Sequence, residues 1–382
     1  MKTVKKIVII GTTDTNMFGF RGDFIQACVA KGYEVFTFVS EFSEKMIQKL
    51  MSIGAQVITY KLSRGGLNPF LDIASYYELK DKIRKINPDV VFSYSTKPVI
   101  YGTMAAHHLG VKSIIGMIEG LGSPFTVHKS GETYKQKITR LIQVNLYRII
   151  FPLLDKIIFL NSDDPVDLVE NYKIKCKRNS IEVLGAIGLN LNYYKYSRWE
   201  DNTPISFIFV ARLLAEKGIF DFIEAAKIVK NKYNNIQFKV IGGIDNENPS
   251  GLSREQLDKL ISQGLIEYDG FVTDVPERLK KSSVFVLPSY YREGVPRSIQ
   301  EAMAVGRPII TTDVPGCRET VINGHNGFLV EKWNPIQLAE KMFYFIKHPK
   351  EINNMGINSF NIAQKNFDAN LVNLKLMKIL NL

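Results

Sequence analysis

Residues 284–306 read VFVLPSYYREGVPRSIQEAMAVG and contain, in this order, a strand, a loop with a glycine and a helix. The apolar run Val284–Leu287 predicts a short buried strand, which Pro288 ends. Val295-Pro296 can open a helix, because proline is tolerated in a first turn, and the helix would run to a stop at Gly306. A strand, a loop and a helix in succession form the unit from which parallel sheets are built.

Two carboxylates, Glu293 and Glu301, lie on either side of the predicted helix start. A helix N-terminus exposes unpaired N–H groups that attract phosphate. The arrangement therefore suits a ligand that combines a sugar, a diphosphate and a ribose. Acids near a helix start also interact favourably with the helix dipole alone, and these two residues by themselves leave both interpretations open.

Apolar runs alternate with amphipathic segments along the whole chain, which predicts parallel sheets built from strand–helix–strand units. In the first half we expect strands at Ile7–Ile10, Glu34–Val39, Gln56–Thr59, Val90–Tyr94, Ser113–Met117, Lys156–Leu160 and Ile181–Leu184. In the second half we expect them at Ile205–Val210, Phe238–Ile241, Ile266–Tyr268, Val284–Leu287 and Ile309–Thr312. The predicted fold is α/β, with two Rossmann-like parallel-sheet domains that face a central cleft.

The length of 382 residues exceeds what one hydrophobic core usually organises, so two domains are expected. We place an N-terminal domain at residues 1–188 and a C-terminal domain at 189–355. Residues 356–382 are expected to form a helix that packs back across the joint. No apolar run reaches the length of a membrane span, and the run after the basic N-terminus is too short for a signal segment.

Charge is distributed unevenly between the two halves of the chain. The net charge is +11, of which residues 1–200 carry +9 and residues 201–382 carry +2. A basic half favours an anionic partner, such as a membrane surface, a nucleic acid or a diphosphate substrate.

The 3 cysteines and 5 histidines show no metal-ligand spacing, and no Asp-x-Asp or Walker motif is present, so we predict no metal and no cofactor.

Arg212 and Lys217 follow the predicted strand at 205–210 and can clamp a diphosphate from two sides. The alternative is a solvated loop with charges at a helix entry. Glu119, which follows the predicted strand at 113–117, could contact an acceptor hydroxyl or serve as its base, or it could be one solvated acid in a turn.

Three further loop residues are candidates for substrate contacts. Gly11 and Thr12 leave the first strand in a loop that lacks the dinucleotide-binding glycine pattern but is expected to face the cleft. Phe271 follows Gly270 in a turn whose backbone could contact a flat base, although a simple turn explains it equally well.

The segment 134–151 has the pattern of a basic amphipathic helix. Such helices lie on anionic membranes, but the same pattern also describes a helix docked on its own sheet with a solvated basic face. The side chains predicted to contact a membrane or a lipid diphosphate are Lys135, Lys137, Arg140 and Arg148.

These motifs together resemble family 4 glycosyltransferases, which are retaining enzymes of the GT-B fold. The resemblance rests on Arg212-x4-Lys217, on Glu293-x7-Glu301, and on the runs DVPGCRE at 313–319 and NGHNGF at 323–328. The run 63–70 and the loop at 119–122 are similar to those of bacterial members that extend undecaprenyl-diphosphate-linked sugars.

The resemblance implies a role for each candidate. Arg212 and Lys217 would hold the donor diphosphate, Glu293 the donor sugar, and Glu301 the ribose. Glu119 would orient the acceptor. The helix start formed by Val295, Pro296, Arg297 and Ser298 would hold the distal phosphate, and Phe271 would line the uracil site.

The resemblance also implies a reaction. A sugar, N-acetylgalactosamine or a related hexose, would pass from a UDP-sugar to a polyprenyl-diphosphate-linked saccharide in surface-polysaccharide or glycoprotein-glycan assembly. The protein would work in the cytoplasm, peripherally on the inner face of the membrane, with no nucleic-acid partner. Two alternatives remain: a non-hydrolysing UDP-sugar 2-epimerase of similar architecture, and a basic nucleic-acid-binding protein, for which the aromatic–basic pattern of an RNA-recognition motif is absent.

Overall fold

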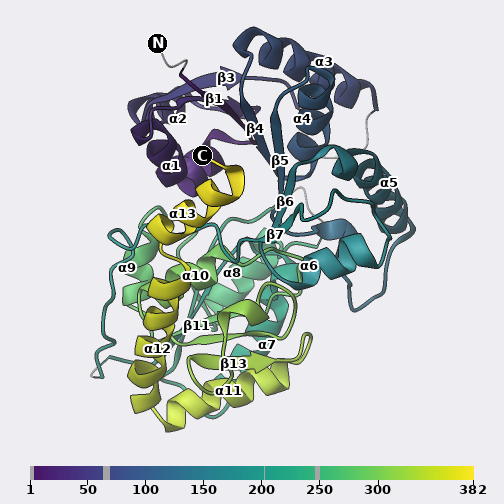
Figure 1. The fold of residues 1–382 in the computed structure, drawn as a ribbon. Coiled ribbons are helices and arrows are strands. Elements are labelled where there is room, and N and C mark those ends of the chain that lie inside the picture. Colours follow the sequence, from purple (N-terminus) through teal and green to yellow (C-terminus); the bar gives the residue numbers. More distant parts are fainter. Residues whose placement is uncertain (1–3, 63–68, 202, 246–249) are drawn as a thin grey trace. The chain divides into compact units, whose positions relative to one another are not determined.

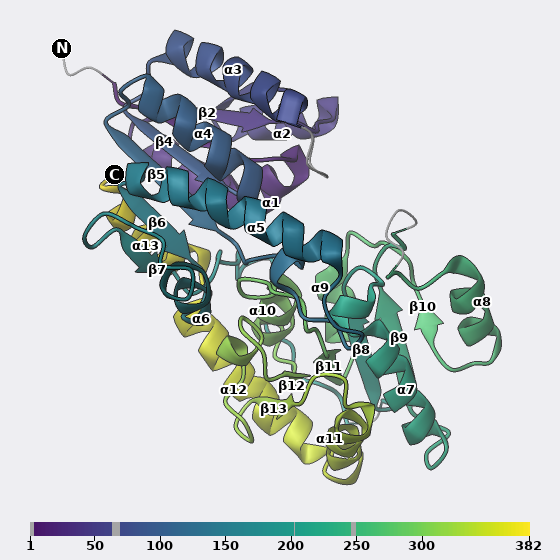
Figure 2. The same ribbon diagram turned by 90° about the vertical axis from the view of Figure 1, so that its right-hand side faces the viewer.

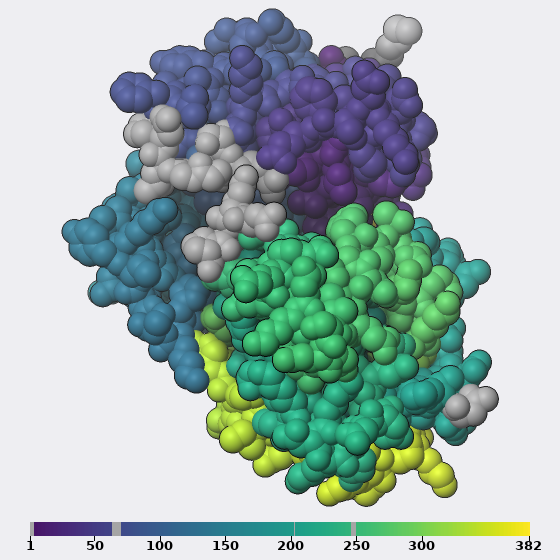
Figure 3. Space-filling view, turned by 180° about the vertical axis from the view of Figure 1, so that it is seen from behind, coloured from purple at the N-terminus to yellow at the C-terminus, as the bar shows by residue number. Residues whose placement is uncertain are grey.

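A computed structural model describes residues 4–62, 69–201, 203–245 and 250–382, which carry the rainbow colours of Figures 1, 2 and 3. The chain forms two compact units. Unit 1 comprises Met1–Pro124, Thr133–Gly188 and Ala369–Leu382, and unit 2 comprises Phe125–Glu132 and Leu189–Asp368. Most of the sequence run at 63–70 lies outside the described residues.

The described part of unit 1 forms a 7-stranded, entirely parallel sheet in the order β3-β2-β1-β4-β5-β6-β7. Its strands are β1 (Lys6–Ile10), β2 (Glu34–Val39), β3 (Ala55–Thr59), β4 (Val90–Tyr94), β5 (Ser113–Ile118), β6 (Lys156–Phe159) and β7 (Ile181–Val183). Its helices are α1 (Asp14–Ala30), α2 (Glu44–Ser52), α3 (Pro69–Ile86), α4 (Thr96–His108), α5 (Tyr134–Ile150), α6 (Asp163–Pro165) and α13 (Ala369–Leu380). Short helical turns are η1 (Ser123–Phe125), η2 (Phe151–Leu153) and η3 (Val166–Glu170).

The described part of unit 2 forms a 6-stranded parallel sheet in the order β10-β9-β8-β11-β12-β13. Its strands are β8 (Ser206–Val210), β9 (Gln237–Ile241), β10 (Glu267–Tyr268), β11 (Val284–Leu287), β12 (Ile309–Thr312) and β13 (Gly327–Val330). Its helices are α7 (Ile219–Lys230), α8 (Arg254–Ser262), α9 (Val275–Lys280), α10 (Arg297–Ala304), α11 (Pro335–Lys347) and α12 (Lys350–Asn366), with helical turns η4 (Ala215–Lys217) and η5 (Arg318–Thr320).

The two sheets share one topology. In each, the first strand of the unit (β1 or β8) lies beside the fourth (β4 or β11), and the second and third strands extend to the other side. This is the doubly wound order, in which ligands bind beyond the carboxyl ends of the strands at the point where the order reverses. The sequence prediction of two Rossmann-like parallel sheets is confirmed.

The central strands are buried on both faces, which is why they read as continuous apolar runs. Every residue of β4, β8, β11 and β12 is buried. Helices cover the two faces of each sheet (Figure 1), as parallel sheets require. The predicted strands match the observed ones to within a residue at each end, except that β13 was not predicted.

The units exchange two short segments of chain. Residues 125–132, which we expected within the first domain, belong to unit 2. There the Oγ1 of Thr126 accepts a hydrogen bond from the N–H of Arg292 (3.1 Å), and the ring of His128 meets that of Tyr290 edge to face. The C-terminal segment is also divided, because α12 belongs to unit 2 and packs on α10, whereas α13 belongs to unit 1 and packs on α1.

Candidate active site

One peptide carbonyl holds together the loops that follow the two central strands of unit 2. The carbonyl oxygen of Glu216, in η4 after β8, accepts hydrogen bonds from the N–H groups of Tyr290 (2.9 Å) and Tyr291 (3.0 Å), which follow β11. The hydroxyl of Ser289 donates to the same oxygen at 3.1 Å. The neighbouring residue, Lys217, is thereby held against the loop that carries Glu293.

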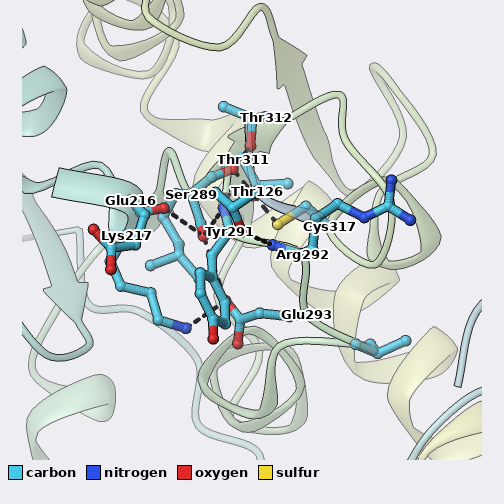
Figure 4. A network of polar contacts seen from close by, with 12 residues as sticks. Thr126, Glu216, Lys217, Ser289, Tyr291, Arg292, Glu293, Thr311, Thr312 and Cys317 are labelled. Atoms are coloured by element: carbon cyan, nitrogen blue, oxygen red, sulfur yellow. Dashed lines mark hydrogen bonds and ion pairs between the residues drawn. The ribbon is translucent and has the colours of Figure 1, made fainter. Parts of the chain in front are cut away.

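Lys217 and Glu293 form an ion pair at this junction (Figure 4). The Nζ of Lys217 lies 2.5 Å from Oε1 of Glu293, and both side chains are largely buried. The hydroxyl of Ser289 lies 3.3 Å from the same Oε1, so its one proton is shared between Glu293 and the Glu216 carbonyl, and Nζ lies 5.1 Å from the ring centroid of Tyr291. The sequence identified both charged residues as ligand contacts but gave no sign that they pair with each other.

The loop after β11 rests on the end of β12. The hydroxyl of Thr311 donates to the carbonyl of Leu287 at 2.6 Å, and that of Thr312 donates to the carbonyl of Ser289. The thiol of Cys317 also points at the Ser289 carbonyl (Figure 4). Because burial raises the pKa of Cys317 to about 12, this thiol stays protonated and serves as packing rather than as a nucleophile.

Helix α10 begins one residue later than expected. Pro296 is its N-cap residue and Arg297 its first helical residue, so the proline precedes the first turn instead of opening it.

Gly316 packs directly on the loop that precedes α10. Its φ is +84°, and a Cβ at that position would lie 2.1 Å from the carbonyl oxygen of Gly294. The glycine in the run at 313–319 is therefore required by the close approach of two backbones.

Glu301 lies inside unit 2 with two partners. Its Oε1 accepts a hydrogen bond from the hydroxyl of Tyr194 at 2.7 Å and one from Nε of Arg297 at 3.1 Å. Burial raises the pKa of this carboxyl above its ordinary value, and the positive charge of Arg297 only partly offsets the effect. The sequence gave no sign of Tyr194 as a partner, since this residue lies in the chain segment between β7 and β8, where no motif marks it.

Arg212 and Phe271 are more exposed than the paired residues. The guanidinium of Arg212 forms an ion pair with Asp245 at 3.1 Å, and its side chain is 56% exposed. Arg212 and Lys217 both follow β8, and each pairs with a different carboxylate, Asp245 or Glu293. Phe271 is 81% exposed and follows Gly270, whose φ of +72° makes the turn that the sequence indicated.

In unit 1, Glu119 lies just beyond β5 and is held by two partners that the sequence did not reveal. The buried guanidinium of Arg21, from α1, lies 2.5 Å from its Oε1. The hydroxyl of Ser95, after β4, donates to its Oε2 at 3.1 Å. Ser95 has a φ of +70°, in the region that favours glycine, so the chain holds a strained residue at this point.

The loop after β1 uses its carbonyl groups within the protein. The Gly11 carbonyl accepts a hydrogen bond from the hydroxyl of Tyr60 at 2.6 Å, and the Thr12 carbonyl accepts one from the N–H of Ser40 at 2.7 Å. A Cβ on Gly11 would lie 2.2 Å from the hydroxyl oxygen of Tyr94. Glycine at this position therefore leaves room for the side chain of Tyr94. The centroid of that ring lies 4.8 Å from Cζ of Arg21.

Helix α5 turns part of its apolar face outward. Its buried side chains are Gln143, Val144, Tyr147 and Ile150. Its exposed large apolar side chains are Tyr134, Ile138, Leu141, Ile142 and Ile149. The basic residues of this helix are Lys135, Lys137, Arg140 and Arg148. The guanidinium of Arg148 donates hydrogen bonds to the side chain of Asn145 and to the carbonyl of Tyr172. An outward apolar stripe with flanking cations is the pattern of a helix that lies in a membrane interface.

The described residues contain no group of three or more His, Cys, Asp or Glu side chains placed to hold a metal ion. None of the described helices is long and apolar enough to cross a membrane.

Comparisons with known proteins identify the class. Residues 197–361 match the family described as glycosyl transferases group 1, and residues 6–159 match that described as glycosyl transferase 4-like. The N,N'-diacetylbacillosaminyl-diphospho-undecaprenol alpha-1,3-N-acetylgalactosaminyltransferase of Campylobacter jejuni is 30% identical, over 98% of both chains. The UDP-Gal:alpha-D-GlcNAc-diphosphoundecaprenol alpha-1,3-galactosyltransferase of Escherichia coli is 28% identical over 77% of each chain.

Solved structures show the same fold. HepE of Anabaena, crystallised with UDP and glucose, superposes with a TM-score of 0.77 at 16% identity over 99% of both chains. The chain therefore belongs to the glycosyltransferases of the group 1 and 4-like families, with the GT-B fold, and is a transferase enzyme.

Gly218 provides a test of the junction between the β8 and β11 loops. Its φ is +83°, and a Cβ would lie 2.2 Å from the carbonyl oxygen of Pro288. An alanine with a left-handed backbone costs roughly 1–2 kcal/mol by itself. We expect Gly218→Ala to lower the free energy of unfolding by well over this amount, because its methyl group would also force the two loops apart.

The matched control is Gly264→Ala. Gly264 has a φ of +63°, but nothing lies within 4 Å of its Cβ position, so only the strain applies. Denaturant unfolding of both variants measures the difference. Equal losses would show that the loops are not held in the close contact described.

Proposed function

We propose that this enzyme transfers a sugar, with retention, from a UDP-sugar to a polyprenyl-diphosphate-linked saccharide in surface-polysaccharide or glycoprotein-glycan assembly. The donor sugar is N-acetylgalactosamine or a related hexose. The observation that carries the proposal is the meeting of the Lys217 ammonium and the Glu293 carboxylate beyond the carboxyl ends of β8 and β11. A sugar joined to a diphosphate needs a cation that binds the diphosphate and, beside it, a carboxylate that accepts hydrogen bonds from the sugar hydroxyls.

The named relatives support the substrate classes. Both the Campylobacter jejuni and the Escherichia coli enzymes carry a diphospho-undecaprenol saccharide in their names, and the second also names a UDP-sugar. The proposal extends these substrates to this chain because the first relative matches it over nearly its whole length.

The donor would lie along unit 2. Lys217 and Arg212 would hold the diphosphate, and the first turn of α10 would hold the distal phosphate through its unpaired N–H groups. Glu293 would accept hydrogen bonds from sugar hydroxyls, and Glu301 from the ribose. The exposed ring of Phe271 would lie against the uracil.

The Lys217–Glu293 pair serves this purpose because it keeps both charges compensated before the donor arrives. When the diphosphate takes the ammonium, the carboxylate is released to the sugar hydroxyls. As the bond between the anomeric carbon and the leaving phosphate breaks, negative charge grows on UDP. A fixed cation and helix N–H groups stabilise that charge, and the proposed mechanism requires no metal.

The acceptor would bind through unit 1. Glu119 would accept a hydrogen bond from the attacking hydroxyl, while Arg21 and Ser95 hold its two carboxylate oxygens in place. The leaving phosphate would take the hydroxyl proton as the new glycosidic bond forms on the same face of the sugar. Glu119 then orients the acceptor, and no covalent sugar–enzyme bond forms.

Peripheral membrane association at the inner face of the cytoplasmic membrane completes the proposal. Helix α5 would lie on the anionic surface with its exposed apolar stripe in the interface. Lys135, Lys137 and Arg140 would contact lipid phosphates. Arg148, which donates to the side chain of Asn145 and the carbonyl of Tyr172, would contact them as well. Nucleic acid is not among the proposed partners.

A transfer assay tests the reaction. Purified enzyme is given a lipid-diphosphate saccharide and a panel of UDP-sugars, including UDP-N-acetylgalactosamine and UDP-galactose, and products are detected by mass spectrometry. We expect one UDP-sugar to be used, with an α-linked product and unchanged activity in EDTA. Turnover of a UDP-sugar without any acceptor would instead identify an epimerase. Transfer from none of the sugars would contradict the proposal.

The ion pair makes a second prediction. We expect Lys217→Met and Glu293→Gln each to lower kcat by about 10²–10³, because each removes electrostatic stabilisation at the reacting centre. The control is Lys227→Met, which breaks the exposed Lys227–Glu224 pair (2.7 Å) on α7 of the same unit. It should leave kcat unchanged. Near-normal kcat in both site variants, with melting temperatures close to wild type, would refute the assignment.

Glu301 makes a prediction about pH. An ionised carboxylate accepts a ribose hydroxyl better than a protonated one, and burial raises the pKa of Glu301. Affinity for the UDP-sugar should therefore fall on acidification at a higher pH than an ordinary carboxyl would cause. Calorimetric titration between neutral and acidic pH measures this. The Glu301→Gln variant should bind the UDP-sugar more weakly at neutral pH and show no such fall in affinity. If its affinity depended on pH as that of wild type does, the ribose contact would be ruled out.

A further inference from the structure

The segment Phe125–Glu132 belongs to unit 2, where it meets the loop that carries Glu293. Thr126 of this segment is fully buried, and its Oγ1 accepts a hydrogen bond from the N–H of Arg292 at 3.1 Å (Figure 4). Arg292 directly precedes Glu293, the carboxylate assigned to the donor sugar. The proposed reaction gives this contact no role so far.

The four backbone N–H groups of residues 290–293 all have hydrogen-bond partners. The first two donate to the Glu216 carbonyl, and the fourth donates to a carbonyl of the loop itself at 2.8 Å. The third, that of Arg292, donates to the Thr126 hydroxyl, which comes from a distant part of the sequence. Thr126 therefore holds the one N–H of this stretch that neither Glu216 nor the loop itself holds, and its removal would leave that N–H without its acceptor.

A second contact of the same segment supports the loop two residues earlier. The ring of His128 meets that of Tyr290 edge to face, with centroids 6.0 Å apart, and the Tyr290 ring in turn meets that of Trp333 at 5.5 Å. Such aromatic pairs are attractive beyond the area that they bury. The segment thus contacts the loop before and after Tyr291, whose ring centroid lies 5.1 Å from Nζ of Lys217.

The direction of Glu293 depends on this support most strongly once the donor is bound. In the proposed reaction the diphosphate takes the Lys217 ammonium from Glu293. The carboxylate then retains the Ser289 hydroxyl and its own backbone, one residue from the N–H that Thr126 holds. A misplacement of about 1 Å near a reacting centre can cost about 10² in rate, so support at this point matters to the reaction.

We propose that Thr126 is a positioning residue for the transfer: through the N–H of Arg292 it holds Glu293 in the direction that the donor sugar requires. The inference rests on the proposed function for the role of Glu293. It adds that a hydroxyl from the segment Phe125–Glu132, which the chain reaches directly after the loop that begins at Glu119, supports the donor site.

Two substitutions of Thr126 provide the test. Thr126→Val keeps the shape of the side chain and removes the hydroxyl, whereas Thr126→Ser keeps the hydroxyl. We expect Thr126→Val to lower kcat by about ten- to a hundredfold, because Glu293 would no longer be held in place. Thr126→Ser should restore most of kcat. Loss of kcat to the same degree in both variants would show that the hydroxyl is not what acts, and would overturn the proposal.

The matched control is Ser283→Ala. Ser283 is also fully buried, and its Oγ accepts a hydrogen bond from the N–H of Ser206 at 2.9 Å, at the amino ends of β8 and β11. The same kind of bond is thus removed at the opposite edge of the same sheet. Ser283→Ala should lower the melting temperature and leave kcat unchanged. A lower melting temperature with normal kcat in Thr126→Val as well would assign Thr126 a structural role alone and reject the proposal.

Donor and acceptor parameters decide which carboxylate is affected, because residues 120–125 join Thr126 to Glu119. Calorimetry without acceptor should show that Thr126→Val binds the UDP-sugar severalfold more weakly than wild type but binds UDP, which carries no sugar, equally well. KM for the acceptor should stay as in wild type. Unchanged affinity for the UDP-sugar together with a raised acceptor KM would place the effect at Glu119 and contradict the proposal.

Hydrogen exchange separates this inference from the proposed reaction. In the full-length protein without substrates, Thr126→Val should exchange the amide hydrogen of Arg292 about tenfold faster than wild type, because that N–H loses its acceptor. Ser283→Ala should exchange it at the wild-type rate. Faster exchange in Thr126→Val, combined with no sugar transfer by wild type, would retain the support of the loop and reject the proposed substrates. An unchanged rate at Arg292 would reject the role of Thr126.

Discussion

The structure of unit 2 depends on the carbonyl oxygen of Glu216, which receives hydrogen bonds from three groups of the loop after β11. Adjacent parallel strands bring the two loops to the same edge of the sheet, and this contact ties one loop to the other. Gly218 allows it, because any side chain there would meet the carbonyl of Pro288. The Lys217–Glu293 pair follows from this arrangement, since each residue lies within a few positions of the contact.

Both units hold a carboxylate in a network of the protein's own side chains. Glu293 has Lys217 and Ser289, and Glu119 has Arg21 and Ser95. Charges removed from water are costly unless they are paired, so the partners stabilise the protein as well as orienting the acids. Partners that fix the direction of a carboxylate also reduce the reorganisation that a reaction at that carboxylate would require. The strained backbone of Ser95 is consistent with a position fixed by its contact with Glu119.

The fold could be predicted well because its signals are local. Strands such as Val284–Leu287 are buried on both faces and read as apolar runs, and turn residues end them. The strand β13 was missed because it starts with Gly327 and follows a polar turn, so its short apolar run lacked the length of a clear signal. The start of α10 was placed one residue early, because proline is common at the first helical position, whereas here Pro296 is the N-cap residue.

The sequence by itself determined the two parallel sheets, the basic first half and the residue types of the candidate site, since periodicity and spacing are properties of neighbouring residues. Tertiary structure alone decided which charges meet. Lys217 pairs with Glu293, Arg21 reaches Glu119, and Tyr194 reaches Glu301. It also decided that α5 turns Ile138 and Ile142 outward. These facts depend on the order of strands in each sheet and on the packing of helices upon it, which bring together residues that are far apart in the chain.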